Sequence, residues 1–379
     1  MPKGGLPKVM LKEYYFFKMH GFNPILVTSQ SPLGNAYLNE LSAVGTVFMG
    51  SAYTENKKNR DISYFFPGLA VSIKDGVTKN SLKLIKFLRS KNPDFVLAHQ
   101  LLSALLMLPS CILLKKKLVL VLHDNPFLFM KQGDDHRINT KRKIVNYFVN
   151  LITRFTFYYS YRIVFTSENI RANTESYIAV EKKGIVLDYG IDIFPRGNYK
   201  REFISVVSKW SKFRNPMFYL ELRKIIPREI KFVMAGRWDS NEECSDFMTA
   251  VTQAGFADSF FVRNELSEEE LSELYDRTRV FVRLGFNESG TGQAILEAIG
   301  HGCPVVISRT IGASSLIEDG KQGFLVEETD LNEIKQKILL LSKDNQLFNE
   351  MSNACYELAN NNSWDNYLIK LSNSLFGTP

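Results

Sequence analysis

Residues 283–308 read RLGFNESGTGQAILEAIGHGCPVVIS and organise the C-terminal part of the chain. An apolar run at 280–282 stands in front of them, as a buried strand does before its carboxyl end. Glycine and hydroxyl residues alternate at 289–292, residues 293–299 have the composition of a helix, and a second apolar run follows at 305–307. A strand, a glycine-rich turn, a helix and another strand in this order predict a βαβ unit.

The turn in this unit has the features of a nucleotide site. Ser289, Gly290, Thr291 and Gly292 open the predicted helix, where unpaired N–H groups and the positive end of the helix dipole favour a phosphate. Glu297 follows about one and a half turns later, and its carboxylate can accept two hydrogen bonds from a diol such as a ribose. Plain tight connections in α/β proteins have similar sequences, so both interpretations stay open from these residues alone.

Length and composition indicate a folded protein of about two domains. The chain has 379 residues, of which 45% are hydrophobic. Its four cysteines form no C-x-x-C pair, which argues for a reducing compartment and against a disulfide framework or a zinc site. The N-terminus lacks the apolar segment of a signal peptide, and the apolar stretch at 101–114 is shorter than the ~20 residues of a membrane span. We therefore expect a cytoplasmic protein that needs no metal or other cofactor.

The charge is divided unevenly between the two halves. Residues 1–190 hold 26 Lys and Arg against 13 Asp and Glu, while the remainder holds 21 against 27. The basic residues at 131–162 stand among tyrosines and phenylalanines, which fits either a membrane-surface patch that delivers a lipid-linked acceptor or a core helix with a solvated basic face. No nucleic-acid-binding motif accompanies this charge, so we expect no nucleic-acid partner.

Helices and strands alternate along the N-terminal half and predict a parallel, doubly wound sheet. The expected helices lie at 8–20, 81–90, 101–113, 144–159 and 167–179, and the expected strands at 25–27, 95–98, 118–122 and 163–165. His99 follows one of these strands, and His123 and Asp124 follow the next, at the edge where such sheets bind ligands. The glycines at 4–5 resemble a turn that normally follows a strand, but no strand precedes them. Either the sheet lacks its first strand or, as we favour, the given sequence starts after that strand.

A second alternation follows a linker predicted at 188–199. Its expected strands lie at 204–207, 232–235, 260–262, 280–282, 305–307 and 323–326, and its expected helices at 217–224, 267–275 and 293–299, before two terminal helices. Ser267 and Glu270 have the spacing of a capping box at the second of these helices. The fold class is therefore α/β, with two Rossmann-like domains that we expect to face each other across a cleft.

Motifs along nearly the whole chain resemble those of the retaining glycosyltransferases of family 4, which have the GT-B fold. They are GGLPKV at 4–9, DFVLAH at 94–99, VLHD at 121–124, IVFTSE at 163–168, GID at 190–192, MAGR at 234–237, SGTGQAILEAIGHGCPVVIS at 289–308, EDGKQGFLV at 318–326 and SW at 363–364. The resemblance implies an N-terminal acceptor-side domain at 1–195, a nucleotide-sugar domain at 196–362, and a helix at 363–379 that packs back toward the N-terminal domain.

The resemblance also implies a role for particular residues on the donor side. Glu297 corresponds to the family's ribose-binding glutamate, while Ser289 stands where a second glutamate contacts the donor sugar, with Glu288 displaced by one residue. Lys209 and Arg214 correspond to the basic pair that holds the donor diphosphate. The glycines of the turn, together with Gly4 and Gly5 in the front loop, complete the donor site.

On the acceptor side, His123 corresponds to the histidine that faces the reacting sugar, and His99 and Asp124 lie beside it in the sheet. We therefore expect transfer of a sugar from a nucleoside diphosphate sugar to a glycan or lipid-linked hydroxyl, without a metal. Two cations and a helix N-terminus would stabilise the leaving diphosphate. The alternatives are another GT-B activity, such as a nucleotide-sugar epimerase, and a catalytically weak nucleotide-sugar-binding homologue.

Overall fold

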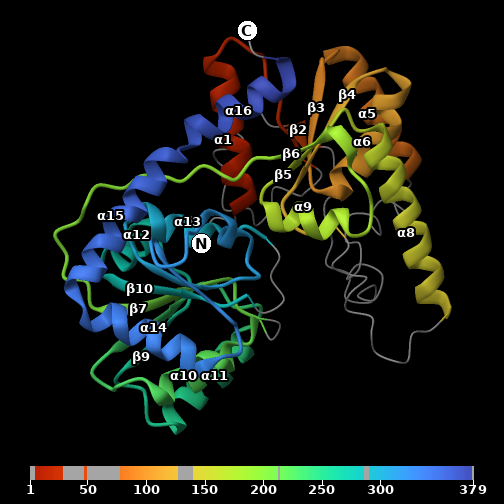
Figure 1. The fold of residues 1–379 in the computed structure, drawn as a ribbon. Helices are drawn as coiled ribbons and strands as arrows, with labels where there is room; N and C mark the ends of the chain where they lie inside the picture. Colours follow the sequence, from red (N-terminus) through yellow and green to blue (C-terminus); the bar gives the residue numbers. More distant parts are fainter. Residues whose placement is uncertain are drawn as a thin grey trace. The chain divides into compact units, whose positions relative to one another are not determined.

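The structure is a computed structural model that describes residues 5–28, 47–48, 77–126, 140–211, 214–285 and 290–377. The chain divides into two compact units, Gly4–Leu187 and Asp188–Pro379, and each contains a parallel sheet with helices (Figure 1). The division falls at the start of the segment predicted as a linker, 188–199, so that this segment belongs to the C-terminal unit. Ile191 is buried there, and the ring centroids of Tyr189 and Trp364 are 5.9 Å apart. The packing of residues 363–379 against the N-terminal part stays a prediction.

The N-terminal unit is built on a parallel four-stranded sheet with the order β3-β4-β5-β6. Its strands are β3 (Phe95–His99), β4 (Lys117–Leu122), β5 (Arg162–Phe165) and β6 (Gly184–Val186), with a separate parallel pair β1 (Val27–Thr28) and β2 (Val47–Phe48). Its helices are α1 (Gly5–Met19), α5 (Val77–Lys91), α6 (Leu101–Leu113), α8 (Thr140–Tyr159), α9 (Glu168–Glu175) and the 3-10 turn η2 (Glu181–Lys183). The sequence missed β6, which has three half-buried residues and therefore no strong apolar signal.

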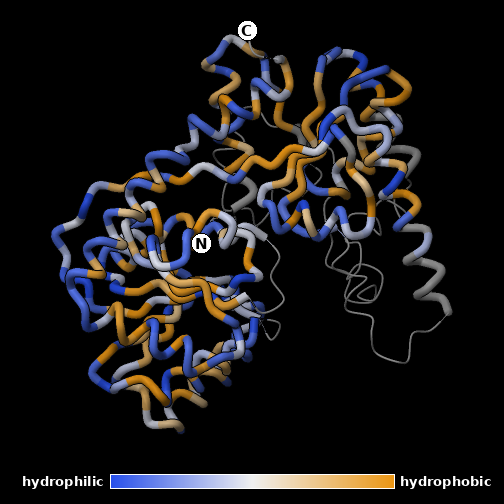
Figure 2. The backbone as a smooth tube through the Cα atoms, viewed as in Figure 1, coloured by the Kyte–Doolittle hydropathy of each residue, from blue (hydrophilic) through white to orange (hydrophobic). Residues whose placement is uncertain are grey.

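Most strands of the two sheets are predominantly apolar, and they appear as orange segments inside each unit (Figure 2). In β4, five consecutive residues are buried because helices cover both faces of a parallel sheet. Sequence periodicity predicts that α1 buries a stripe formed by Val9, Leu11, Tyr15, Phe16 and Met19. That prediction is partly wrong, because Tyr15 and Met19 are exposed, while Tyr14 and Phe17 are buried in their place. The run Tyr-Tyr-Phe-Phe surrounds the helix with aromatic groups, so periodicity could not select the buried face.

The C-terminal unit contains a parallel six-stranded sheet with the order β12-β11-β10-β7-β8-β9. Its strands are β7 (Phe203–Val207), β8 (Lys231–Ala235), β9 (Phe260–Arg263), β10 (Thr278–Arg283), β11 (Val305–Ser308) and β12 (Gly323–Val326). Its helices are α10 (Pro216–Ile225), α11 (Asn241–Gln253), α12 (Glu268–Asp276), α13 (Gln293–Gly300), η4 (Gly312–Leu316), α14 (Leu331–Lys343), α15 (Asn345–Asn361) and α16 (Trp364–Phe376). This strand order is that of a Rossmann sheet, and the chain reverses direction between β7 and β10.

Local signals account for most boundaries in this unit. The predicted capping box at α12 is confirmed: the Ser267 hydroxyl accepts from Glu270 N at 3.1 Å, and Glu270 Oε2 accepts from Ser267 N at 2.8 Å. The sequence missed α11, whose buried stripe is narrow among many polar residues. It also predicted two terminal helices instead of three, because Asp344 both ends α14 and caps α15 without a break in the helical pattern.

Within the described part of the chain, no helix combines the length and the apolar character that a membrane crossing requires. The four cysteines are free thiols, and each is buried.

Candidate functional site

The centre of the C-terminal sheet is the place where a ligand is expected. β7 and β10 are neighbours there, and the connections that leave them run to opposite sides of the sheet. In doubly wound sheets, ligands bind outside the carboxyl ends of the strands at this switch point. The loops that follow β7, β8, β10 and β11 carry Lys209, Arg237, Gly290 and Thr310, respectively.

The glycine turn has an unusual backbone that only glycine adopts easily. Gly292 has φ +74° and ψ 72°, and it begins α13 without a side-chain cap. A Cβ atom added there would lie 2.9 Å from Ile295 Cδ1. The turn is fixed from outside by η4, since Gly312 N donates to Gly290 O at 3.1 Å and a Cβ on Gly312 would lie only 2.9 Å from that oxygen. The N-terminal amides of α13 therefore follow a turn that packs closely against η4.

Two polar side chains accompany these amides. Thr291 is buried, and its place in the turn matches the sequence-based prediction. The Gln293 side-chain amide nitrogen is also buried, and it has no hydrogen-bond partner among the residues that the structure describes. A buried donor of this kind normally finds an acceptor, so it is suited to a ligand oxygen. The sequence analysis did not single out Gln293, because nothing in a helical QAILEA segment distinguishes a site residue.

Glu297 is oriented by a partner that the sequence did not reveal. The Tyr275 hydroxyl donates to Glu297 Oε2 at 3.1 Å, and Tyr275 is buried at the end of α12. Burial and the Glu297 carboxylate raise the pKa of Tyr275 well above its usual range, so the phenol stays a donor. Glu297 itself is half-buried. One of its oxygens is thus held by the protein, which fixes the direction of the carboxylate.

The loop after β7 carries the predicted basic pair. Lys209 Nζ forms an ion pair with Asp239 Oδ1 at 2.8 Å, and the Lys209 side chain is 62% exposed. Arg214 is half-buried, and its backbone N–H donates to Ser211 O at 2.9 Å. The fully buried Trp210 anchors this loop, with its indole N–H donating to Ala235 O at 2.8 Å. Lys209 therefore extends from a fixed backbone.

The loops after β7 and β8 touch at Gly236. This residue has φ +119°, and a Cβ atom added to it would lie 1.8 Å from Ser208 O. Trp210 N donates to Arg237 O at 2.7 Å immediately beside this contact. The glycine of the MAGR motif thus lets the ends of β7 and β8 approach closely beside the switch point, which is a packing role.

Some predicted donor residues lie outside the described residues. These are Gly4, Glu288 and Ser289, so their contacts with a donor stay predictions. Gly5 is the first residue of α1.

The predicted acceptor-side residues come together at the carboxyl ends of β3 and β4. His99 Nδ1 lies 3.0 Å from His123 Nε2, and the two rings stack with an interplanar angle of 15°. Gln100 has the unusual values φ 76° and ψ 151°, and its side-chain amide donates to Asp124 Oδ2 at 3.4 Å. Such strained backbone is common at functional sites. The sequence missed Glu13 on α1, whose Oε2 lies 2.9 Å from His99 Nε2.

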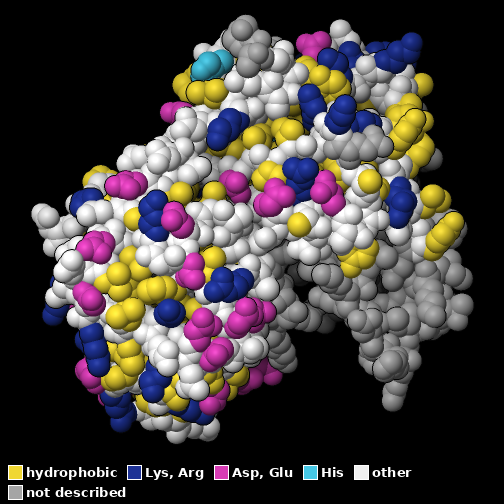
Figure 3. All heavy atoms as spheres, in the orientation of Figure 1, with side chains coloured by type: hydrophobic (Ala, Val, Ile, Leu, Met, Phe, Trp, Pro, Cys, Tyr) yellow, Lys and Arg dark blue, Asp and Glu magenta, His cyan; other side chains and the backbone are white. Residues whose placement is uncertain are grey.

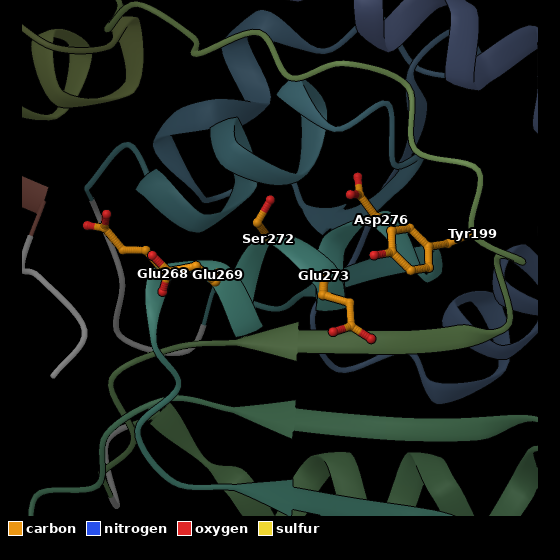
Figure 4. Close-up of a pocket in the computed structure, with 6 residues that line it drawn as sticks. All are labelled: Tyr199, Glu268, Glu269, Ser272, Glu273 and Asp276. Carbon is orange, nitrogen blue, oxygen red and sulfur yellow. The ribbon is translucent and has the colours of Figure 1, made fainter.

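A separate hollow of about 500 Å³ lies beside α12 (Figure 4). Its lining residues are Tyr199, Glu268, Glu269, Ser272, Glu273 and Asp276. Four carboxylates around one space would repel a phosphate, and none of the predicted site residues lines it. The hollow is therefore not the nucleotide site.

A parallel sheet with the Rossmann strand order, a glycine turn at a helix N-terminus and an oriented carboxylate behind it define the C-terminal unit as a doubly wound α/β unit. Family models identify it further: residues 195–358 match "Glycosyl transferases group 1", and residues 49–193 match "Glycosyltransferase Family 4". The chain belongs to glycosyltransferase family 4, and its fold is GT-B.

Known relatives are distant. The poly(glycerol-phosphate) alpha-glucosyltransferase of Bacillus subtilis (strain 168) is 24% identical over 187 residues, which are 48% of this chain and 26% of that protein. Anabaena HepE in complex with UDP-glucose superimposes with a TM-score of 0.72 at 13% identity, covering 99% of this chain and 96% of that chain. Sucrose-phosphate synthase of Thermosynechococcus elongatus gives 0.75 at 12% identity, with coverage of 97% and 92%. At such identities the structures establish the fold alone.

Proposed function

We propose that this glycosyltransferase moves a hexose from a nucleoside diphosphate sugar to a hydroxyl group of a glycan or a lipid-linked acceptor, with retention of configuration. The observation that carries the proposal is the α13 turn at the switch point, with Glu297 held behind it by Tyr275 at 3.1 Å. The fold is also that of Anabaena HepE, whose structure contains UDP-glucose. The donor class follows from the chemistry of the turn and is consistent with that neighbour.

Donor binding is assigned to groups of the C-terminal unit. The uncapped N–H groups of α13 and the buried Gln293 amide are donors for phosphate oxygens. We assign the ribose diol to the Glu297 carboxylate, because a carboxylate accepts several hydrogen bonds at once and the Tyr275 hydroxyl orients it by donating to Oε2. A phosphate on one side of the turn and a ribose on the other together specify a nucleotide.

In the transfer, the bond between the anomeric carbon and the diphosphate oxygen breaks, and a bond to the acceptor oxygen forms on the same face. The acceptor hydroxyl passes its proton to the leaving diphosphate oxygen on that face, and nucleoside diphosphate leaves. Negative charge grows on the leaving diphosphate, and Lys209 and Arg214 would stabilise it. We assign His123, His99 and Asp124 to the acceptor side of the reaction. We propose that the cations perform the charge stabilisation that a metal provides in other transferases.

The first experiment is a donor screen. The protein is mixed with UDP-glucose, UDP-N-acetylglucosamine, UDP-galactose or GDP-mannose, and thermal shift and released nucleoside diphosphate are measured. We expect one donor to stabilise the fold selectively, by about 2.7 kcal/mol when its concentration is 100 times the Kd. We also expect slow release of nucleoside diphosphate through transfer to water.

The same screen separates the alternatives. A binding homologue would show the thermal shift without release of nucleoside diphosphate. An epimerase would convert one nucleotide sugar into another, with the sugar still attached to the nucleotide in the product. No stabilisation by any donor would contradict the nucleotide site. Glu297→Ala should lose the stabilisation by the donor. Its matched control Glu357→Ala, which removes an exposed glutamate on α15, should behave as wild type.

We also propose that the N-terminal unit contacts an anionic membrane surface through α8. This helix exposes Tyr147 (67%), Leu151 (52%) and Tyr158 (72%), and hydrophobic side chains are visible along it (Figure 3). Arg154 lies on the same helix, and Lys183 approaches the Tyr158 ring at 5.4 Å from its centroid. Exposed aromatic groups beside cations are typical of helices that lie in the lipid interface.

The membrane contact predicts a specific loss of vesicle binding. Wild-type protein should sediment with vesicles that contain phosphatidylserine, and less so at high salt because charge screening weakens the attraction. The double variant Leu151→Ser and Tyr158→Ser should bind at least about tenfold more weakly, because two buried apolar side chains contribute more than 1.4 kcal/mol. Met248→Ser, at a similarly exposed position on α11, is the control. Equal binding by all three proteins would contradict the proposal.

A further inference from the structure

The end of β10, from which the chain continues to the α13 turn, is fixed by two side-chain hydroxyls. Leu284 N donates to Tyr219 Oη at 3.0 Å, and Gly285 N donates to Ser308 Oγ at 2.7 Å. Both hydroxyl residues are fully buried, and Tyr219 lies on α10 while Ser308 is the last residue of β11. The backbone pairing of β10 with β11 ends at Arg283. The two hydroxyls therefore bind the first two N–H groups beyond the strand pairing.

The neighbouring strands end differently. After β7, Ser208 N donates to Ala235 O at 3.1 Å, and after β8, Gly236 N donates to Arg263 O at 3.0 Å. These acceptors are backbone carbonyls, so the bonds need no particular side chain. A buried hydroxyl costs free energy unless it forms a hydrogen bond, and phenylalanine or alanine would fill the two hydroxyl positions at β10 without that cost. The end of β10 thus depends on two particular side chains, unlike the ends of β7 and β8.

The segment 308–312 contacts both described ends of the connection between β10 and α13. At the first end, a Cβ atom added to Gly285 would lie 2.6 Å from Thr310 Oγ1. At the second end, Gly312 N donates to Gly290 O at 3.1 Å. The residues predicted to contact the donor sugar stand between these two ends in the sequence. One short segment therefore sets the positions of both ends.

We propose that Tyr219 and Ser308 are positioning residues for the hexose of the donor, because they fix the strand end that precedes the predicted sugar contacts. The inference rests on the proposed function and extends it to recognition of the sugar. Nucleotide binding is assigned to the amides of α13 and to Glu297, and the bond that supports this turn, from Gly312 to Gly290, joins backbone atoms. Loss of either hydroxyl therefore affects the sugar and leaves the binding of nucleoside diphosphate intact.

A comparison of catalysis with nucleotide affinity tests this proposal. Tyr219→Phe and Ser308→Ala each remove one hydroxyl and keep the rest of the side chain. With the donor that the screen identifies, we expect either variant to lower kcat/KM for the nucleotide sugar about tenfold, the size of one lost hydrogen bond. The Kd for the free nucleoside diphosphate, measured by calorimetry, should not change.

The matched controls lose hydrogen bonds of the same kind elsewhere in the C-terminal unit. The buried Tyr356 hydroxyl donates to His301 O at 3.0 Å, and the buried Ser352 hydroxyl donates to Gly302 O at 2.7 Å, at residues that follow the C-terminal end of α13. Tyr356→Phe and Ser352→Ala should lower the Tm as the first pair does but leave kcat/KM unchanged. If both pairs changed kcat/KM equally, or if the first pair also lost affinity for nucleoside diphosphate, the hydroxyls would serve general stability and the inference would be wrong.

Hydrogen exchange followed by mass spectrometry tests the two bonds without a donor. In peptides that contain Leu284 and Gly285, one amide should exchange about tenfold faster in each variant of the first pair, because that amide loses its acceptor. The control pair should exchange there as wild type does. Unchanged exchange in both Tyr219→Phe and Ser308→Ala would overturn the inference. A wild type that neither binds nor hydrolyses any donor would instead contradict the proposed function, and the exchange rates would still show whether the hydroxyls fix the end of β10.

Discussion

Replacement of Glu297 by alanine is expected to weaken nucleotide-sugar binding about 100-fold, because hydrogen bonds to a charged group contribute about 1.5–3 kcal/mol and 1.4 kcal/mol is a tenfold change in affinity. The fold should survive, since the Glu297 side chain is only half-buried. The measurement is titration calorimetry with the donor found in the screen and with its nucleoside diphosphate.

The Tyr275→Phe variant tests whether donor binding depends on the Glu297 carboxylate itself or on the Tyr275 hydroxyl that orients it. The phenylalanine variant removes the donor to Glu297 Oε2 but keeps the carboxylate and its charge. We expect a loss of only a few-fold in donor affinity, since the carboxylate loses its fixed direction but not its acceptors. If Glu297→Ala bound the donor as tightly as wild type, the ribose assignment would be wrong. If both variants lost the same large amount, Tyr275 rather than Glu297 would be the main determinant.

Gly236→Ala is expected to have the largest effect on stability. A Cβ at this position would lie 1.8 Å from Ser208 O, and the residue has φ +119°. The backbone conformation alone costs an L-residue roughly 1–3 kcal/mol, and the clash must separate the ends of β7 and β8. We expect the C-terminal unit to lose about 3 kcal/mol or more, which lowers its Tm by about 6–12 °C. Scanning calorimetry of the full chain measures this change, and donor affinity should fall with it because Lys209 follows Ser208.

Gly255→Ala is the matched control for that experiment. Gly255 also has a positive φ of +76°, but the nearest atom to an added Cβ is Arg228 Nη2 at 3.9 Å, an ordinary contact. The substitution should lower the free energy of unfolding only by the roughly 1–2 kcal/mol that the left-handed backbone conformation costs an L-residue. Similar Tm changes in the two variants would show that the approach of β7 and β8 is not close, contrary to the structure.

Hydrophobic periodicity and the residues that cap or end helices and strands were sufficient to predict most of the secondary structure. Continuous apolar runs located the strands of both sheets except β6, and the 3.6-residue pattern located most of the helices. The Ser267 capping box was confirmed in both of its hydrogen bonds. The failures have a common cause: β6 has three residues, and α11 buries only a narrow stripe. In both segments few residues are buried, so the hydrophobic pattern in the sequence is too weak to indicate a strand or a helix.

The candidate site was predictable where one local segment contains it. Gly290, Thr291, Gly292 and Glu297 are close in the chain, so spacing alone placed them on one turn and its helix, and the structure agrees. Glu288, Ser289 and Gly4 lie outside the described residues and stay predictions. Gln293 could not be distinguished, because only its buried side-chain nitrogen, which has no hydrogen-bond partner among the described residues, separates it from other helical glutamines.

The sequence by itself therefore determined the fold class, the family motifs and the residues of the glycine turn, since each depends on neighbours within about two helical turns. Only the tertiary structure decided which side chains orient the site. Tyr275 is 22 positions from Glu297, and His99 is 24 from His123, while Glu13 reaches His99 from a different helix. These contacts depend on the order of parallel strands, which brings the ends of distant segments to one edge. No local sequence pattern specifies the order of the strands in the sheet.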